Sequence, residues 1–214
     1  MVSFAFQLCT ESSPINFLAH LLLGGETDAE LTGALLGDFV KGPVGPDWPP
    51  VLAHGIRLHR AIDSFTDAHP VWRTSKARFP QSQRRFASIT VDVAYDHLLA
   101  SAWPKYYVRP LGEFSALAYA SIARFEPWFP PRLQRMFPVM AKEDWLTGYA
   151  SLEITCEQLR RMSTRSPRLA PLAATADTIP AIYADLENDF EAFFPELESF
   201  ARAWRAKGIP TASR

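Results

Sequence analysis

Apolar positions recur at helical spacing along most of the chain, and the first clear case carries an anomaly. Leu31, Ala34 and Leu35 fall at i, i+3 and i+4, as on the buried face of a helix. The next position of that stripe, i+7, is Asp38. Burying a carboxylate in a protein core costs several kcal/mol of folding free energy, on the order of what burial of one large apolar side chain contributes, unless a partner compensates the charge. The pattern therefore predicts a partner for Asp38.

The same periodicity predicts a chain made of helices. The sequence TDAE at 27–30 is a capping box that opens the first of these helices, and Gly42 is expected to close it. No sustained alternation of period two indicates a strand, and the 18 prolines are typical of breaks between many helices. We therefore expect an all-α fold, an irregular multi-helix bundle. The further helices are predicted over residues 50–67, 89–103, 113–125, 145–162 and 179–207.

Composition and charge narrow the class of protein. The chain has 214 residues, 48% hydrophobic and 21% charged, which suits one folded domain. The net charge of −1 gives no global field for nucleic acid or membrane, and no apolar run approaches the ~20 residues of a membrane span. Cys9 and Cys156 match no metal-binding spacing, and the N-terminus lacks the basic region of a signal peptide. We expect a cytoplasmic protein with reduced thiols.

Two pairs of polar residues share helix faces. His59 and Asp63 are four apart on a helix whose apolar residues project on the same side, so the pair is expected to point at least partly inward. Asp92 and Asp96 are also four apart, at the edge of an apolar face, where like charges repel unless they share a cation. A simple His–Asp hydrogen bond and two solvated carboxylates remain the alternatives.

The other histidines are weaker candidates. His20 lies in a segment that is apolar almost all round, where a satisfied core histidine is the usual outcome. His97 follows Asp96 directly and is a secondary candidate for the same ion. His54 lies on the opposite side of its helix from His59, and His69, which precedes a proline in a turn, is expected at the surface.

Taken together, these residues favour a metal site. Bundles hold metals in mixed clusters of histidine and carboxylate between packed helices. Without thiolates and with several oxygen donors, the set suits Mn²⁺, Mg²⁺ or Fe²⁺ better than a structural zinc. On this hypothesis Asp38 faces a metal ion. The candidate ligands are His20, Asp38, His59, Asp63, Asp92 and Asp96.

Five ordered motifs resemble the acyl carrier protein phosphodiesterase family, also called holo-acyl-carrier-protein hydrolase. They are NFLAHL, GALLGDFVKG, GIRLHRAID, ITVDVAYDHLL and RMSTRSPRL. The resemblance runs over nearly the whole chain, which predicts a single domain over 15–207 and an N-terminal extension over 1–14.

The resemblance implies a fold and an activity. The family is regarded as a divergent relative of the HD-type metal phosphohydrolases, so an HD-domain-like arrangement of helices is expected. Its enzymes cut the phosphodiester that joins 4′-phosphopantetheine to a serine of acyl carrier protein, with a divalent metal that is typically Mn²⁺. By resemblance, Asp38 matches an aspartate needed for activity, and His20, His59 and Asp63 match the family's other polar motif positions. We expect Asp38 and His59 to be catalytic.

Basic residues supply the expected dock for an acidic carrier protein, with a solvated surface charge as the alternative for each. Two further functions stay open at this stage: an HD-type hydrolase of a nucleotide, and a helical module that binds a metal or a carrier protein without turnover. The candidate docking or phosphate-binding residues are Arg57, Arg60, Arg84, Arg85, Arg160 and Arg161; Arg165 and Arg168 lie in the same basic segment.

Overall fold

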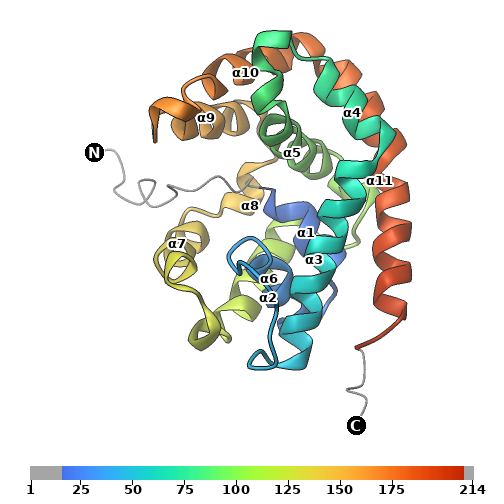
Figure 1. Cartoon of the computed structure of the whole chain (residues 1–214), viewed down its shortest axis with the longest axis vertical. Coiled ribbons are helices and arrows are strands. Elements are labelled where there is room, and N and C mark those ends of the chain that lie inside the picture. The colour runs from blue at the N-terminus through green and yellow to red at the C-terminus, as the bar shows by residue number, and fades with distance from the viewer. Residues whose placement is uncertain (1–15, 210–214) are drawn as a thin grey trace.

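The computed structural model describes residues 16–209, and within them it contains helices and no strands (Figure 1). The prediction of an all-α bundle is therefore confirmed. The predicted extension over 1–14, residue 15 and Cys9 lie outside the described residues. Short 3₁₀ turns join several of the helices. The α-helices are α1 (Phe17–Gly24), α2 (Asp28–Leu36), α3 (Pro50–Ala68), α4 (Pro70–Ala77), α5 (Arg84–Ser101), α6 (Leu111–Ala123), α7 (Pro131–Lys142), α8 (Trp145–Gly148), α9 (Leu152–Ser163), α10 (Leu172–Thr178) and α11 (Tyr183–Ala206).

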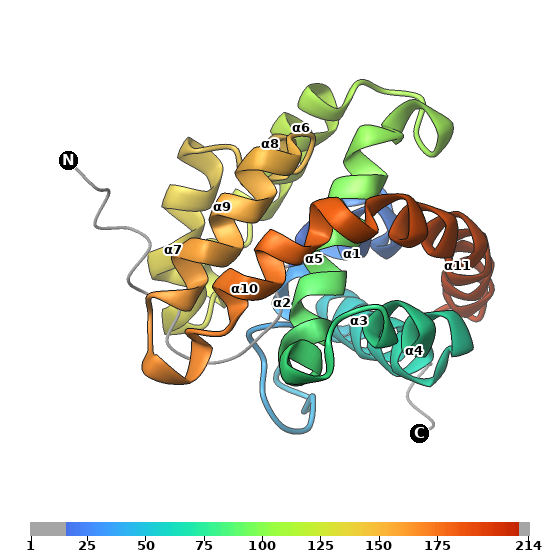
Figure 2. The same ribbon diagram turned by 90° about the horizontal axis from the view of Figure 1, so that it is seen from above.

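The short helix α1 lies in the middle of the bundle. It packs against α2, α3, α5 and α11, and Figure 2 shows it between the α3–α4–α11 side and the α6–α9 side. Its sequence, FLAHLLLG, is apolar almost all round, as expected for a helix surrounded by others. His20 is the polar exception and is only 3% exposed. The most apolar helix thus carries a histidine into the centre of the fold.

Helix α2 begins as predicted and ends early. The Thr27 side chain accepts from the Glu30 backbone, and the Glu30 carboxylate accepts from the Thr27 backbone, so the capping box is confirmed. The helix stops at Leu36, six residues before the predicted Gly42. A tight turn follows, in which the N–H groups of Phe39 and Val40 both donate to the Leu36 carbonyl at 2.9 Å. Asp38 therefore lies in this turn rather than on the helix stripe.

The helix predicted over 145–162 is two helices, and the prediction of one was wrong. Ser151 starts α9 by accepting a hydrogen bond from the Ile154 N–H at 3.3 Å. Between α8 and α9, Tyr149 is fully buried and its carbonyl accepts from His97 Nδ1 at 2.7 Å. The chain therefore bends where a buried side chain and a cap fix it.

The long helix α11 closes one side of the bundle against α3, α4 and α5 (Figure 2). Its phenylalanines pack with aromatic residues of α4 and α5, and the ring of Phe193 lies 5.7 Å from that of Tyr95. His69, which joins α3 to α4, is buried against Phe65 and Phe193, so the expectation of a surface position was wrong. No helix within 16–209 has the length and apolarity needed to cross a membrane.

Candidate metal centre

Helices α2 and α3 approach each other so closely that only glycine fits at the crossing. A Cβ on Gly33 would lie 2.8 Å from the Gly55 Cα, and a Cβ on Gly55 would lie equally close to the Gly33 Cα. Four residues after Gly33, in the turn that follows α2, Gly37 lies against the ring of His59 on α3, and a Cβ there would overlap that ring. Real Cβ atoms do not approach other carbons this closely. The crossing therefore places the turn after α2 directly on His59.

His59 is buried and its ring orientation is fixed by the backbone of α2. Its Nδ1 lies 2.8 Å from the Ala34 carbonyl oxygen, which can only accept, so Nδ1 carries a proton. Its Nε2 faces two carboxylates, at 3.7 Å from Asp38 Oδ1 and 3.3 Å from Asp63 Oδ2. A histidine held through Nδ1 by a carbonyl, with Nε2 directed at acids, is the usual arrangement of a metal-binding imidazole.

His20 joins the same group from α1. Its ring stacks on that of His59 with centroids 3.7 Å apart and planes 18° from parallel. Its Nε2 lies 3.2 Å from Asp63 Oδ1, so the two oxygens of Asp63 each meet one histidine. The other ring nitrogen of His20, Nδ1, has no hydrogen-bond partner among the described residues. Two stacked imidazoles in a core have no packing advantage over apolar side chains, which points to a role in binding.

The geometry of this cluster suits one cation. His20, His59 and Asp63 each offer a donor atom, and these atoms lie within 4.8 Å of one another. Two atoms bound to one ion at about 2.1 Å lie roughly 3.0–3.4 Å apart for octahedral or tetrahedral angles. The separations of 3.2 and 3.3 Å from Asp63 to the two histidines fall in that range. Asp38 lies near this group but is not part of it, with Oδ1 3.7 Å from His59 Nε2.

Burial and the neighbouring charges shift the pKa values of the histidines and carboxylates of this site. Burial lowers the pKa of His20, and the neighbouring His59 lowers it further. Burial also acts to lower the pKa of His59, but the charges of Asp38 and Asp63 outweigh it and raise that pKa. Burial raises the pKa of Asp38. For Asp63, burial is outweighed by hydrogen bonds from both histidines, which hold its pKa well below the usual range.

The second acidic pair lies next to the cluster without entering it. Asp96 is fully buried, and its two oxygens accept from the backbone N–H groups of Leu18 and Ala19, each at 2.9 Å. It thus satisfies the free N–H groups at the start of α1, although burial raises its pKa to about 7. Asp92 accepts from Asn16 Nδ2 at 3.3 Å, and burial and the neighbouring carboxylates raise its pKa well above the usual value. Both lie within reach of the cluster as part of one cavity wall.

A cavity of about 410 Å³ opens beside the cluster. Its wall includes His20 and Asp63 of the cluster, the acids Asp92 and Asp96 of α5, and side chains of α11. A cavity of this size and mixed character is typical of a small-molecule site. Both histidines are buried but Asp63 is half exposed, so the cluster can be reached from outside the protein.

Comparison with known proteins identifies the family. A family model described as "Acyl carrier protein phosphodiesterase" matches residues 15–197. The chain belongs to the acyl carrier protein phosphodiesterase family. A relative of that name from Serratia proteamaculans (strain 568) is 37% identical over 191 residues, which cover 88% of this chain and 98% of the relative. Relatives of the same name from Yersinia pestis and Salmonella agona (strain SL483) are 36% and 38% identical, each over 86% of this chain and 95% of the relative. No solved structure matches the chain.

None of the arginines that the sequence singled out lines the cavity beside the cluster. Arg57 and Arg60 project from α3 and donate to the carbonyls of Val44 and Val40, in the loop that follows α2. Arg84 and Arg85 are exposed at the start of α5. Arg160 and Arg161 are exposed on α9 and pair with Asp177 and Glu157.

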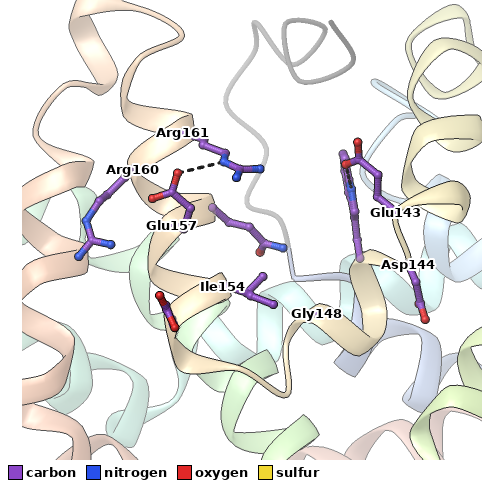
Figure 3. A pocket seen from close by; sticks show the side chains of 10 residues that line it. Glu143, Asp144, Gly148, Ile154, Glu157, Arg160 and Arg161 are labelled. Atoms are coloured by element: carbon purple, nitrogen blue, oxygen red, sulfur yellow. Dashed lines mark hydrogen bonds and ion pairs between the residues drawn. The ribbon is translucent and has the colours of Figure 1, made fainter. Parts of the chain in front are cut away.

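A larger cavity of about 520 Å³ lies between α8 and α9, and it shares no residue with the cluster's cavity. Figure 3 shows Arg160 and Arg161 on α9, with Glu143 and Asp144 on the opposite side. The Arg161–Glu157 pair at 3.1 Å leaves that guanidinium already engaged. Among the described residues, the larger cavity has no histidine in its wall, whereas the smaller one is lined by His20 and Asp63 of the cluster.

Two features of the centre were not expected from the sequence. Gly37 was read only as part of a helix, although its spacing of four from Gly33 is a signal of close helix approach. His97 was a secondary candidate for the ion, yet it contacts Tyr149 and Tyr183 and lies outside both the cluster and its cavity. The ligand roles of Asp38, Asp92 and Asp96 stay predictions.

Proposed function

We propose that this chain hydrolyses the phosphodiester between 4′-phosphopantetheine and the carrier serine of holo-acyl carrier protein, and releases apo-acyl carrier protein. The observation that carries the proposal is the cluster of buried His20, buried His59 and half-exposed Asp63 beside a cavity that His20 and Asp63 line. The names of the relatives supply the substrate, and the cluster supplies a chemistry that a phosphodiester needs. The free thiol of Cys156 agrees with a cytoplasmic site of action, which we also propose.

We propose that His20, His59 and Asp63 hold one divalent cation, most plausibly Mn²⁺, with Mg²⁺ or Fe²⁺ as alternatives. A mixed set of imidazole and carboxylate donors suits these ions. The Ala34 carbonyl keeps His59 in the tautomer whose Nε2 lone pair is directed into the cluster. A bound divalent ion at this place supplies hydroxide near neutral pH and neutralises charge on the phosphoryl oxygens.

Asp38 is placed to handle a proton in this reaction. It is 7% exposed, it lies 3.7 Å from His59 Nε2, and burial raises its pKa, which brings a carboxylate nearer to the range of a general base. In hydrolysis, the oxygen of water bonds to phosphorus, the bond from phosphorus to the serine oxygen breaks, and the serine oxygen gains a proton. Asp38 would accept the proton of the attacking water and hold His59 in position.

The carrier protein would dock near the loop over residues 37–49. Arg57 and Arg60 lie on α3 beside His59 and border this loop, and Arg57 and Lys41 are exposed. A carrier with an acidic surface would meet these positive charges while its serine approaches the cluster. Charges at the rim of an interface mainly set the rate of encounter and its salt dependence.

The decisive experiment incubates the protein with holo-acyl carrier protein and Mn²⁺ and follows the carrier by mass spectrometry. We expect the carrier's mass to fall by that of the 4′-phosphopantetheine arm, EDTA to stop the reaction and added Mn²⁺ to restore it. His59→Gln should abolish the conversion. His54→Gln is the matched control, because His54 is also a buried histidine of α3 but packs against Trp204, with ring centroids 4.4 Å apart. Full activity after removal of metal, or in His59→Gln, would refute the proposed mechanism.

A further inference from the structure

The cavity beside the cluster has both polar and apolar side chains in its wall. His20 and Asp63 of the cluster line it, and so do apolar side chains of α4, α5 and α11. They include Trp72 of α4 and Phe193 of α11, whose rings pack against each other, and Ile89 of α5. Figure 2 shows α11 running across this side of the bundle, next to α4 and α5. A ligand that reaches from the cluster into the cavity therefore passes from a polar centre to an apolar wall.

The charges of the cavity exclude a second anionic group on that ligand. Its wall carries the carboxyl groups of Asp63, Asp67, Asp92 and Asp96, and no lysine or arginine among the described residues lines it. One phosphate can be neutralised at the cluster by a divalent cation, but a further phosphate deeper in the cavity would meet carboxylates. A nucleoside di- or triphosphate, or the acidic surface of a carrier protein, is therefore a poor match.

The size of the cavity points the same way. About 410 Å³ is within the usual range of roughly 300–1,000 Å³ for small-molecule sites and far too small for a folded partner. A phosphodiester bound at the cluster has two substituents, the carrier serine and the pantetheine arm. The arm is uncharged: it has a gem-dimethyl group, a hydroxyl, two amides and a thiol. It alone has the size and charge for this space.

We propose that the cavity is the binding site for the pantetheine arm, with the gem-dimethyl group against the apolar wall and the carrier protein outside. This inference rests on the proposed function, because it takes the phosphate to lie at the cluster. Ile89 of α5 and Thr66 of α3 line the cavity from different helices, and both are partly buried. The hydroxyl of Thr66 also lines the cavity, as does Asn16, whose Nδ2 donates to Asp92 and whose Oδ1 can accept from the arm's amides.

The test compares the binding of two ligands to the full chain loaded with Mn²⁺, by titration calorimetry. Inorganic phosphate measures the cluster alone, and 4′-phosphopantetheine measures the cluster and the cavity. Burial of two methyl groups corresponds to roughly a tenfold gain in affinity, so 4′-phosphopantetheine should bind at least about tenfold more tightly than phosphate. Ile89→Trp should remove most of this preference, because the indole would fill the space.

Two further variants keep the test decisive. Ile154→Trp is the matched control, because Ile154 is 49% exposed and lines the separate cavity between α8 and α9, so the preference should persist. Thr66→Phe narrows the cavity from α3 and replaces Ile89→Trp if that variant does not fold. Equal affinity for the two ligands in the unaltered protein, or a preference that survives both cavity-filling variants, would overturn the assignment. The mass spectrometric assay tests the proposed function separately. If the protein cleaves holo-acyl carrier protein but binds 4′-phosphopantetheine no more tightly than phosphate, this inference is refuted and the proposed function is not.

Discussion

Gly37→Ala should separate the packing of the bundle from the working of the cluster. Gly37 has φ −51° and ψ −38°, a conformation that alanine adopts without cost, so backbone strain plays no part. The added methyl group is the whole perturbation. It would overlap the His59 ring and lie 2.5 Å from the His59 Cβ.

The magnitude follows from this distance. Carbon atoms in contact lie about 3.5–4.0 Å apart, so His59 or the turn must move by roughly 1 Å. The Nδ1 to Ala34 bond of 2.8 Å cannot survive such a shift of the ring unchanged. Losing such a support to a metal-bound histidine costs about 10–100-fold in metal affinity or activity. Overpacking should also lower the free energy of unfolding by about 1–3 kcal/mol.

The assay is titration calorimetry with Mn²⁺, together with thermal melts of the metal-free proteins. Gly33→Ala is the control for packing, since its methyl group would meet the Gly55 backbone at 2.8 Å rather than the His59 ring. Gly112→Ala controls for the change itself, because nothing lies within 4 Å of that position. We expect both Gly33→Ala and Gly37→Ala to lower the free energy of unfolding. For the same loss of stability, Gly37→Ala should lose more Mn²⁺ affinity than Gly33→Ala. Unchanged Mn²⁺ affinity in a folded Gly37→Ala protein would refute the reasoning.

Three further predictions concern the charges of the site. Asp38→Asn should weaken Mn²⁺ binding and turnover while the melting temperature of the metal-free protein holds or rises, because burial already disfavours this carboxylate; a destabilised variant with normal Mn²⁺ affinity would contradict it. Mn²⁺ affinity should fall as the pH falls through the raised pKa of His59, because the proton and the ion compete for the same nitrogen. In Asp38→Asn the midpoint of this fall in affinity should move to lower pH, which calorimetry at several pH values would show. Arg57→Glu should raise KM for holo-acyl carrier protein and flatten its salt dependence with kcat retained, whereas Arg160→Glu should change KM less, because Arg160 is already paired with Asp177; the reverse order would move the dock to α9.

The sequence predicts much of the helical framework, because local patterns determine where helices form. The capping box at the start of α2 and the extent of α3 are both local signals, and both agree with the structure. The pairing of His59 with Asp63 is local as well, since residues four apart share a helix face. The end of α2 was missed because the turn after Leu36 packs on α3, and the spacing of Gly33 and Gly37 that indicates this close approach was not used.

The arrangement of the site depends on contacts between distant segments, and these were only partly predictable. Asp96 binds the first N–H groups of α1, 77 and 78 residues away in the chain, where the sequence favoured a cation as its partner. The stacking of His20 on His59 joins α1 to α3, and the apolar surroundings of His20 favoured a simple core position. Gly37 gives no hydrophobic signal at all, because its role is to leave space. The residue types therefore predicted a metal site, but only the structure shows which of these residues lie together and which bind the backbone instead.

The most direct test of the account is an anomalous difference map from crystals grown with Mn²⁺ and measured at the manganese edge. The account predicts a peak among His20, His59 and Asp63, within about 2.0–2.3 Å of a donor atom of each. A map with no peak at this cluster, or with its strong peak at other residues, from protein that cleaves holo-acyl carrier protein in the same Mn²⁺ solution, would contradict the central claim.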